Sequence, residues 1–475
     1  MEHAVWIPGV PMLCESESSE MTCLEETFVA SSSRGKQMVE YAAATTPKYD
    51  DPLCVVRRKE LELQVDNDQW GEKMHRYPAS IRDLGRWYTV PTIVSIGPYH
   101  HGLDHLKKGE EAKYAAVCSC ISQSEYSLQQ MYDAVVSVAS EARRLYDKDT
   151  MAGIHHENIF CPMMFYDACF LVQFMLYKSR KRDKIHPWLQ IFFKSNKDHI
   201  YHDILLLENQ LPRVVMEIFE LFMPVNLKKF AKRFKATLQN STLPKEVEVK
   251  SSAIHDSTEA LYKAPHFLGY VRFYIVGTNR FEKYEPDKKT KVISFSVSAV
   301  ELAEMGITLT PNNTSTELAH IGFKEGRLGL SAELLLPHIL LSYLNASFLV
   351  NMAAFEITSN PSNRGEDTAV CSYVQLLGML MDKEEDVQEL RSKRLLQGGG
   401  GLTDKEALDF FTSLHGVTMG PLYHRTIRNV EMYKQNKGMW VQVYAFFYKY
   451  KKTMLAVLSA IATMFAIFGA FNKSR

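Results

Sequence analysis

The chain has 475 residues, of which 46% are hydrophobic, and its 55 Lys and Arg are balanced by 55 Asp and Glu. This neutral balance gives no electrostatic case for binding nucleic acid or a strongly acidic partner. The 8 cysteines are scattered, and the close pair Cys118 and Cys120 lacks the second pair that a zinc site needs. We therefore expect a reducing compartment, no metal or other cofactor, and a sizeable apolar core.

Residues 1–67 are predicted to form a disordered leader. Their polar stretches show no sustained helical or strand period. The apolar patch at residues 5–13 is interrupted by Pro8 and Pro11 and has no basic flank, so it does not read as a signal peptide. We expect a globular domain at residues 68–435 to follow.

A short strand-like run at residues 92–96 precedes a turn with aromatic and histidine side chains. Gly97 and Pro98 are the turn signal, and Tyr99, His100 and His101 follow directly. The histidines could form an acid–base or metal site, but their spacing matches no known ligand motif. We favour a packed, hydrogen-bonded loop.

Two helices are expected next in the chain. Apolar residues recur at helical spacing over residues 128–145, which predicts an amphipathic helix. Residues 163–177 are apolar on nearly every side and too few to cross a bilayer, so they predict a central buried helix. Asp167 lies within it, either as a functional carboxylate with a shifted pKa or as the partner of a cation or a backbone N–H. The paired carboxylate is the interpretation we favour.

The stretch at residues 202–215, HDILLLENQLPRVV, predicts an elbow between two helices. Pro212 has no amide donor and suits the first turn of a new helix. The polar triplet Glu208, Asn209 and Gln210 lies between apolar residues and needs internal hydrogen bonds, which we expect to come from main chain. A binding or catalytic role for the carboxylate is the alternative.

Strand signals concentrate at residues 292–330, where polar and apolar residues alternate, and they predict a small antiparallel element with a hairpin turn at residues 324–327. Residues 331–356 and 370–380 return to a helical pattern. The glycines at residues 398–401 have no Lys-Ser or Lys-Thr after them, so they predict a loop without phosphate binding. The fold class is therefore a predominantly α-helical α+β protein.

Residues 454–471 contain no charge and predict a single C-terminal transmembrane helix. At about 1.5 Å per residue it extends about 27 Å, close to the roughly 30 Å thickness of the hydrocarbon core. Residues 436–453 before it are aromatic and basic, typical of a membrane interface. The surplus of lysines on that side places the large domain in the cytoplasm, while possible glycosylation triplets at Asn240, Asn312, Asn313 and Asn345 point the other way.

A stripe of small side chains runs along this predicted anchor. Ser459, Thr463, Ala466 and Ala470 recur at spacings that place them on one helix face. Small residues allow transmembrane helices to approach closely, so the stripe predicts a homo-oligomer formed through the anchor. Alternatively, the alanines merely fill a weakly hydrophobic helix.

Several segments in order give the chain a family resemblance. VPTIVSIGPYHHG (residues 90–102), DACF (167–170), DILLLENQLP (203–212), HIGFKEGRLGL (320–330) and LVNMAAFE (349–356) resemble the successive signatures of the plant family called domain of unknown function 247. The resemblance implies a plant-specific, largely helical, membrane-anchored protein, and some grass members are associated with pollen self-incompatibility. The family-motif candidates are Gly97, Pro98, Tyr99, His100, His101, Asp167, Glu208, Asn209 and Gln210.

Three functional hypotheses follow from these features. The first is a tail-anchored protein whose partners are membrane lipid and an unknown protein, acting in recognition or interaction, in the form of self/non-self signalling that the resemblance implies. The second is a membrane-tethered enzyme that uses Asp167 or Glu208 with a histidine. The third is a structural membrane scaffold. No catalytic triad, phosphate loop or dinucleotide motif is present in the sequence, so we lean away from the enzyme.

Overall fold

The computed structural model describes residues 55–61, 64, 70–179, 184–239, 262–277, 297–312, 317–326, 331–359, 368–398, 401–414, 417–436, 450, 453–454 and 456–464. Contacts divide the chain into one unit at residues 1–68 and another at residues 69–475, and the elements below belong to the second. Most of the expected leader and of the expected interfacial segment lies outside the described residues.

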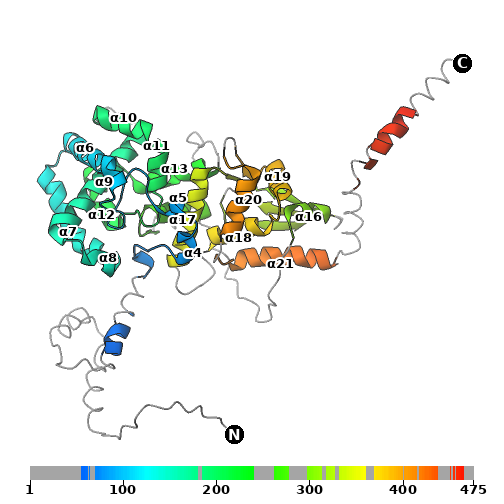
Figure 1. Cartoon of the computed structure of the whole chain (residues 1–475), viewed down its shortest axis with the longest axis horizontal. Helices are drawn as coiled ribbons and strands as arrows, with labels where there is room; N and C mark the ends of the chain where they lie inside the picture. Colours follow the sequence, from blue (N-terminus) through cyan, green and yellow to red (C-terminus); the bar gives the residue numbers. More distant parts are fainter. Residues whose placement is uncertain are drawn as a thin grey trace, which may run out of the picture. The chain divides into compact units, whose positions relative to one another are not determined.

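The described fold is mostly helical, as the sequence predicts (Figure 1). Short helical turns are η1 (Trp70–Glu72), η2 (Asp104–Leu106) and the π-helical η3 (His156–Phe160). The α-helices are α4 (Ala79–Arg82), α5 (Arg86–Thr89), α6 (Lys107–Gln123), α7 (Leu128–Arg144), α8 (Lys148–Ala152), α9 (Cys161–Lys178), α10 (Pro187–Ser195), α11 (Lys197–Asp203), α12 (Arg213–Phe222), α13 (Leu227–Gln239), α15 (Phe267–Val276), α16 (Ala299–Glu304), α17 (Tyr343–Ser359), α18 (Ala369–Met379), α19 (Glu384–Ser392), α20 (Asp404–Ser413) and α21 (Pro421–Asn436).

Helix α9 is the centre of the first helical layer. It is apolar nearly all round, so it can be stable only when other helices cover every face, and α6, α7 and α12 pack against it. With η3 it forms a continuous helix at His156–Lys178, the described helix long and apolar enough to cross a membrane. However, 83% of that apolar window is buried in the protein, so the prediction of a central core helix is confirmed, although the helix is longer than expected.

Helix α17 connects this layer to the rest of the domain. It contacts α5, α11 and η1 from the first half of the chain, and α15 and α18 from the second. The run Asn345–Glu356 is buried throughout. Because the helix is covered on all sides, any polar residue on it must find its hydrogen bonds within the protein.

The sheet differs from the predicted antiparallel element. Strand β3 (Ala332–Leu336) lies between β1 (Ile307–Pro311), to which it is parallel, and β2 (Gly322–Glu325), to which it is antiparallel. A second pair, β4 (Ile339–Leu340) and β5 (Leu396–Gln397), is also parallel. The helix predicted over residues 331–342 was wrong, because a short apolar run such as Ala-Glu-Leu-Leu-Leu fits a buried strand as well as a helix.

The predicted transmembrane segment is described only in part. Residues 456–464 are helical, whereas residues 455 and 465–471 lie outside the described residues. Membrane-spanning length in the described part of the chain is therefore found only in the internal helix at His156–Lys178, and not at the C-terminal position that we expected.

Candidate functional site

The family-motif residues meet around an extended segment, residues 92–97, that runs through the core. The sequence predicts a short strand here, but the segment pairs with no strand in the described part of the chain, and residues 94–97 are buried. Its buried N–H groups therefore need acceptors from side chains. Those acceptors come from α9, from α11 and from the elbow after α11.

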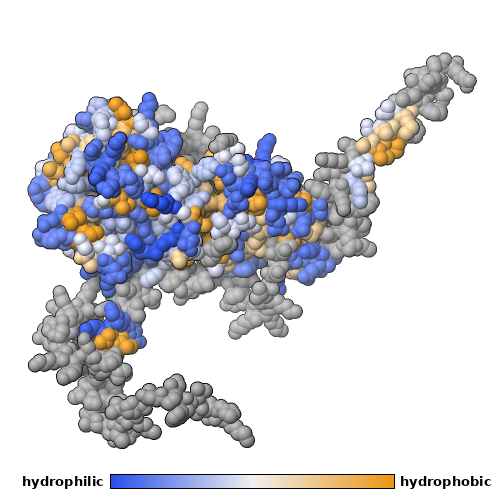
Figure 2. All heavy atoms as spheres, in the orientation of Figure 1, coloured by the Kyte–Doolittle hydropathy of each residue, from blue (hydrophilic) through white to orange (hydrophobic). Residues whose placement is uncertain are grey.

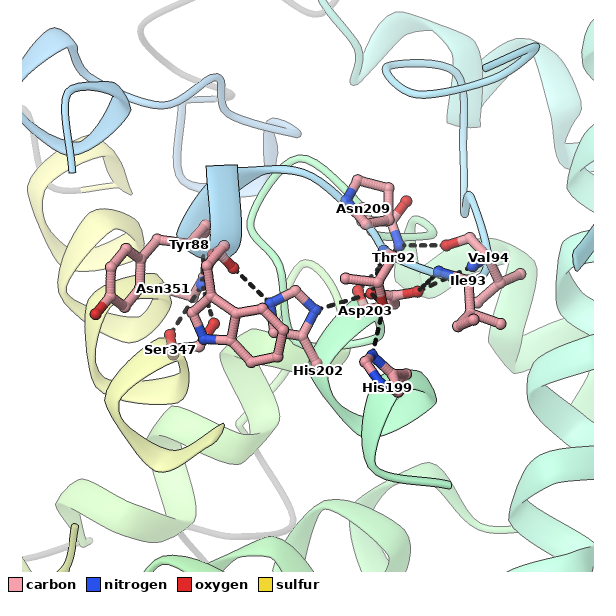
Figure 3. A network of polar contacts seen from close by, with 12 residues as sticks. Tyr88, Thr92, Ile93, Val94, His199, His202, Asp203, Asn209, Ser347 and Asn351 are labelled. Atoms are coloured by element: carbon pink, nitrogen blue, oxygen red, sulfur yellow. Dashed lines mark hydrogen bonds and ion pairs between the residues drawn. The ribbon is translucent and has the colours of Figure 1, made fainter. Parts of the chain in front are cut away.

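Asp203, the last residue of α11, binds the start of this segment (Figure 3). Its Oδ1 accepts from the N–H of Thr92 at 2.8 Å, and its Oδ2 accepts from the N–H groups of Ile93 and Val94 at 2.7 and 2.9 Å. The Thr92 hydroxyl donates to the same carboxylate at 3.1 Å. A fully buried carboxylate is thus satisfied largely by main-chain donors.

His202 and Asp203 form a buried pair that resembles a catalytic dyad. His202 Nδ1 lies 2.8 Å from Asp203 Oδ1, and His202 Nε2 faces the carbonyl oxygen of Trp87 (Figure 3). Both ring nitrogens therefore face oxygen atoms of the protein itself, so both positions of the imidazole are taken up by internal contacts. This geometry fixes α11 against the residue 87 region and does not provide a general base.

The elbow residues Asn209 and Gln210 bind main chain on both sides of the bend. Asn209 Oδ1 accepts from the N–H of Ile96 at 2.6 Å, and Asn209 Nδ2 donates to the carbonyl oxygens of Val94 and Asp203 at 3.1 and 2.9 Å. Gln210 donates to carbonyl oxygens within residues 204–209 and accepts from the N–H of Leu268 at 3.0 Å. The elbow thus holds residues 94–96 and the start of α15 together.

Glu208 completes the elbow, and Pro212 ends it. The Glu208 side chain accepts from the N–H of Tyr77 at 2.7 Å and lies 3.4 Å from Arg76 Nε. Glu208, Asn209 and Gln210 are 6%, 0% and 3% exposed, so the predicted burial and main-chain bonding are confirmed. Pro212 is the N-cap of α12, so the predicted new helix begins one residue after it and not at the proline itself.

Asp167 of α9 holds the end of the segment together with a buried lysine. Its Oδ2 accepts from the N–H of Gly97 at 2.7 Å, and its Oδ1 lies 2.6 Å from Lys113 Nζ. The same ammonium group donates to Glu110 at 2.6 Å and to the hydroxyl of Ser95 at 3.2 Å. The carboxylate is therefore paired with a cation and a main-chain N–H, as the sequence argument favoured.

Burial dominates the electrostatics of this pair. It raises the pKa of Asp167 to about 6, and Glu110 adds to the effect, whereas Lys113 and the N–H of Gly97 oppose it. Burial alone would lower the pKa of Lys113, but the neighbouring Asp167 and Glu110 outweigh it and raise that pKa. Lys113 therefore stays charged under all ordinary conditions and is a structural cation.

The turn at residues 97–101 is a packed loop, as predicted. Gly97 has a φ of +73°, and a Cβ there would approach the Tyr146 hydroxyl and the carbonyl oxygen of Gln210 to less than 3 Å, so no other residue fits. The Tyr99 hydroxyl donates to the carbonyl oxygen of Met74. Pro98 and His100 are buried, while His101 is exposed.

The two histidines of the turn resist protonation. Burial, helped by the charge of Arg76, lowers the pKa of His100 to about 4, whereas His101 is exposed and its pKa is lowered by partial desolvation. Among the described residues, the carboxylates of Asp167 and Glu208 contact main chain and cations, and neither contacts a histidine. The carboxylate–histidine pair that the enzyme hypothesis requires is therefore not formed in the described part of the chain.

Sequence reasoning missed a further residue of this site, Asn351 on α17. Its Oδ1 accepts from the Tyr77 hydroxyl at 2.6 Å and from the N–H of Leu207 at 2.8 Å, and its Nδ2 donates to the carbonyl oxygens of Tyr88 and Ser347 (Figure 3). Asp203, His202 and Lys113 were missed as well. The available signal for Asn351 was an isolated polar residue in an apolar run, residues 348–355.

A further buried carboxylate, Glu356, lies on α17 beyond Asn351. Glu356 Oε1 is 2.8 Å from Arg272 Nε, and the carboxylate accepts from the N–H groups of Val370 and Cys371 at 3.1 and 2.8 Å. It therefore caps the start of α18 and ties α15 to α17. Its pKa is raised by burial, against the opposing charge of Arg272.

The described residues contain no group of three or more His, Cys, Asp and Glu side chains that could hold a metal ion. Of the self-association candidates, Ser459 and Thr463 lie on the helix at residues 456–464, where the Thr463 hydroxyl donates to the carbonyl oxygen of Ser459 at 2.8 Å. Ala466 and Ala470 lie outside the described residues. The site around residues 92–97 thus consists of side chains that bind the protein's own main chain.

Comparisons with known proteins agree with the sequence resemblance. The model of the family DUF247, described as plant protein of unknown function, matches residues 74–468. A UPF0481 protein of Arabidopsis thaliana is 23% identical over 426 residues, covering 82% of this chain and 83% of that protein. The comparison with solved structures gives no match.

Proposed function

We propose a function from one premise: this chain belongs to the DUF247 family of plant proteins. We infer that it is a recognition protein held at a membrane by residues 454–471, which presents its helical domain to a protein partner. The specific role that the resemblance suggests is self/non-self recognition of the self-incompatibility type. Nothing in the proposal requires catalysis.

The observation that carries the proposal is the exposed apolar surface of the helix at residues 456–464. Val457, Leu458, Ile461 and Met464 are 52%, 63%, 41% and 62% exposed, and Figure 2 shows hydrophobic atoms along this helix. A helix that exposes large apolar side chains on successive turns is unstable in water and favourable in lipid. The sequence continues without charge to residue 471, which fits a membrane span.

The polar site supports recognition over chemistry. Asp167, Asp203 and Glu208 each accept from main-chain N–H groups, so the charges stabilise the fold. Because these three carboxylates are engaged inside the domain, we expect a partner to bind the surface of the domain. Residues that decide partner choice would therefore lie outside the family motifs.

We place the domain on the cytoplasmic side. The lysines before the anchor favour this orientation. Two of the four possible glycosylation sites that argue against it, Asn312 and Asn345, are only 8% and 2% exposed, so a folded domain would not present them to a glycan. Glycosidase-sensitive mass on the mature chain would reverse the orientation.

The anchor is tested by alkaline extraction of membranes from plant cells that express the full-length chain. We expect the wild type to stay in the membrane pellet and the variant Leu458→Lys, Ile461→Lys, Met464→Lys to become soluble, because lysine at the centre of a span costs roughly 3 kcal/mol per residue. Leu221→Lys, at an exposed apolar residue of α12, is the matched control and should stay in the pellet. Extraction of the wild type would overturn the proposal.

We further propose that the anchor self-associates through Ser459, Thr463, Ala466 and Ala470. Close approach of small residues is the main attraction between helices in lipid, and a hydroxyl can add about 0.6 kcal/mol. The double variant Thr463→Leu, Ala466→Leu should weaken dimerisation in a membrane reporter assay without changing insertion. An unchanged dimer signal would remove this part of the proposal.

A further inference from the structure

A second surface that suits a membrane lies on α10, far from the proposed anchor in sequence. Trp188 and Ile191 on this helix are 42% and 65% exposed. They are three residues apart, so they project from the same side of the helix. Figure 2 shows hydrophobic atoms at the surface where Figure 1 places α10.

The exposure of these two side chains is not a result of a loosely held helix. Leu189, Phe192 and Phe193 of α10 are buried, and the ring of Phe193 lies 5.3 Å from that of Phe174 in α9. The start of α10 is fixed to α6 as well, since the hydroxyl of Ser119 accepts from the N–H of His186 at 3.1 Å. The helix therefore presents Trp188 and Ile191 from a rigid base.

The rim of this apolar surface is basic. Lys184 before the helix and Lys194 in its last turn are both exposed. Helix α13, which contains basic residues and no acidic one, lies beside the end of α9, where Arg233 donates to the hydroxyl of Ser179 at 3.0 Å. Helix α10 itself contains no acidic residue, so Lys184 and Lys194 give this surface a positive charge that favours an anionic partner.

We propose that the α10 surface, formed by Trp188, Ile191, Lys184 and Lys194, docks on an anionic lipid bilayer. Trp is favoured at membrane interfaces, and lysines around an apolar centre are attracted by anionic headgroups. The proposal rests on the membrane attachment proposed above, which would keep α10 near lipid permanently. Docking would fix the orientation of the domain and decide which of its surfaces a partner can reach.

The test places a fluorescent amino acid at position 191 of the full-length chain, reconstituted into vesicles whose acyl chains are brominated near the headgroups. The matched control carries it at position 221, a residue that is 72% exposed on α12, where Glu217 and Glu220 make the surroundings acidic. We expect quenching at position 191 in vesicles that contain anionic lipid, and much less in purely zwitterionic vesicles or at position 221. High salt should weaken the quenching, because it screens exposed charges.

Replacing both lysines (Lys184→Ala, Lys194→Ala) should reduce the docking equilibrium about thirtyfold, since each basic residue near an anionic surface contributes about fivefold. Equal quenching at positions 191 and 221 would overturn the proposal, and so would quenching at 191 that is the same in anionic and zwitterionic vesicles. Binding of an acidic peptide in place of lipid would overturn it as well.

Alkaline extraction distinguishes the proposed α10 contact from the proposed anchor. A chain that resists extraction but shows no quenching at 191 refutes only the α10 contact, and an extractable chain that is still quenched refutes only the anchor.

Discussion

Two extended segments in this domain satisfy their main-chain hydrogen bonds in opposite ways. Strand β3 lies between β1 and β2 and exchanges its hydrogen bonds with their main chains. Residues 92–97 belong to no strand, and their N–H groups donate instead to the side chains of Asp203, Asn209 and Asp167. The strand thus depends on a shared backbone ladder, and the other segment depends on three particular side chains.

This difference shows the structural role of the polar side chains of Asp203, Asn209 and Asp167. A backbone ladder can form with many sequences, whereas a carboxylate that accepts from two or three buried N–H groups cannot be replaced by an apolar residue without leaving those donors unsatisfied. The three side chains come from α9, α11 and the elbow, so residues 92–97 also hold these elements in place. Single substitutions should therefore be costly around residues 92–97 and mild on the exposed face of β3.

The largest effect is expected for Asp203→Ala. The substitution removes the acceptor of the buried N–H of Val94 and of the partly buried N–H groups of Thr92 and Ile93, and each unsatisfied buried group costs roughly 1–3 kcal/mol. We expect the free energy of unfolding to fall by at least about 3 kcal/mol, measured by denaturant unfolding of the full-length protein. Asp198→Ala, an exposed acid on the same helix, is the control and should change it by less than about 0.5 kcal/mol. Similar values for both would refute the dependence on Asp203.

The next effect is a pH dependence that arises from Asp167. Its pKa in the folded protein is about 6, above the ordinary value of 3.8, because the carboxylate is buried. The folded state therefore binds the proton more tightly than the unfolded state, so this stabilisation is complete below about pH 4 and is lost as the pH rises through 6. At about 1.4 kcal/mol per pKa unit, the loss is about 2 to 3 kcal/mol.

The variant Asp167→Asn isolates the contribution of this carboxylate to the pH dependence of stability, because an amide does not titrate. Between pH 4 and pH 6.5 the wild type should lose about 2 to 3 kcal/mol of unfolding free energy relative to the variant. Comparing the two at each pH cancels the contribution of other groups. A difference that stays constant, or that grows in favour of the wild type with pH, would contradict the raised pKa.

The same comparison explains which parts of the structure could be predicted from sequence. Helix α7 follows from local periodicity, α9 from an apolar run too long for a strand, and strands β1 and β2 from alternation. Strand β3 was missed because a run of adjacent leucines carries no period that separates strand from helix. The mixed sheet could not be predicted, because the parallel pairing of β1 and β3 is decided by the path of the chain between them.

The sequence predicted several of the residues that form the polar site, but not the groups to which they bind. Glu208, Asn209 and Gln210 were identified as buried because apolar residues flank them. Some of their partners, such as the N–H of Ile96 for Asn209 and the N–H of Tyr77 for Glu208, lie more than a hundred residues away in the chain, and no spacing signals such a contact. Lys113 was missed for a different reason. It lies in a charged helical stretch that predicts a solvent-exposed face, yet it is only 1% exposed.

A smaller effect is expected for Glu208→Ala. This side chain accepts from one main-chain donor, the N–H of Tyr77, and its ion pair with Arg76 is long and partly exposed. We expect a loss of about 1 to 2 kcal/mol in unfolding free energy. Glu217→Ala, which removes an exposed pair with Arg213 on α12, should cost at most about 0.5 kcal/mol. Unchanged stability together with lost partner binding would make Glu208 a recognition residue.

The smallest effect is expected on the strand, for Glu333→Ala. Glu333 is the exposed second residue of β3, opposite Lys324 of β2 and Thr308 of β1. Its main-chain hydrogen bonds remain when the side chain is shortened, and an exposed cross-strand charge pair contributes only a few tenths of a kcal/mol. We expect the free energy of unfolding to fall by less than about 0.5 kcal/mol, measured under the conditions used for Asp203→Ala. A loss of unfolding free energy above about 1 kcal/mol would show that side chains stabilise the sheet as they stabilise residues 92–97. The contrast between the two segments would then not hold.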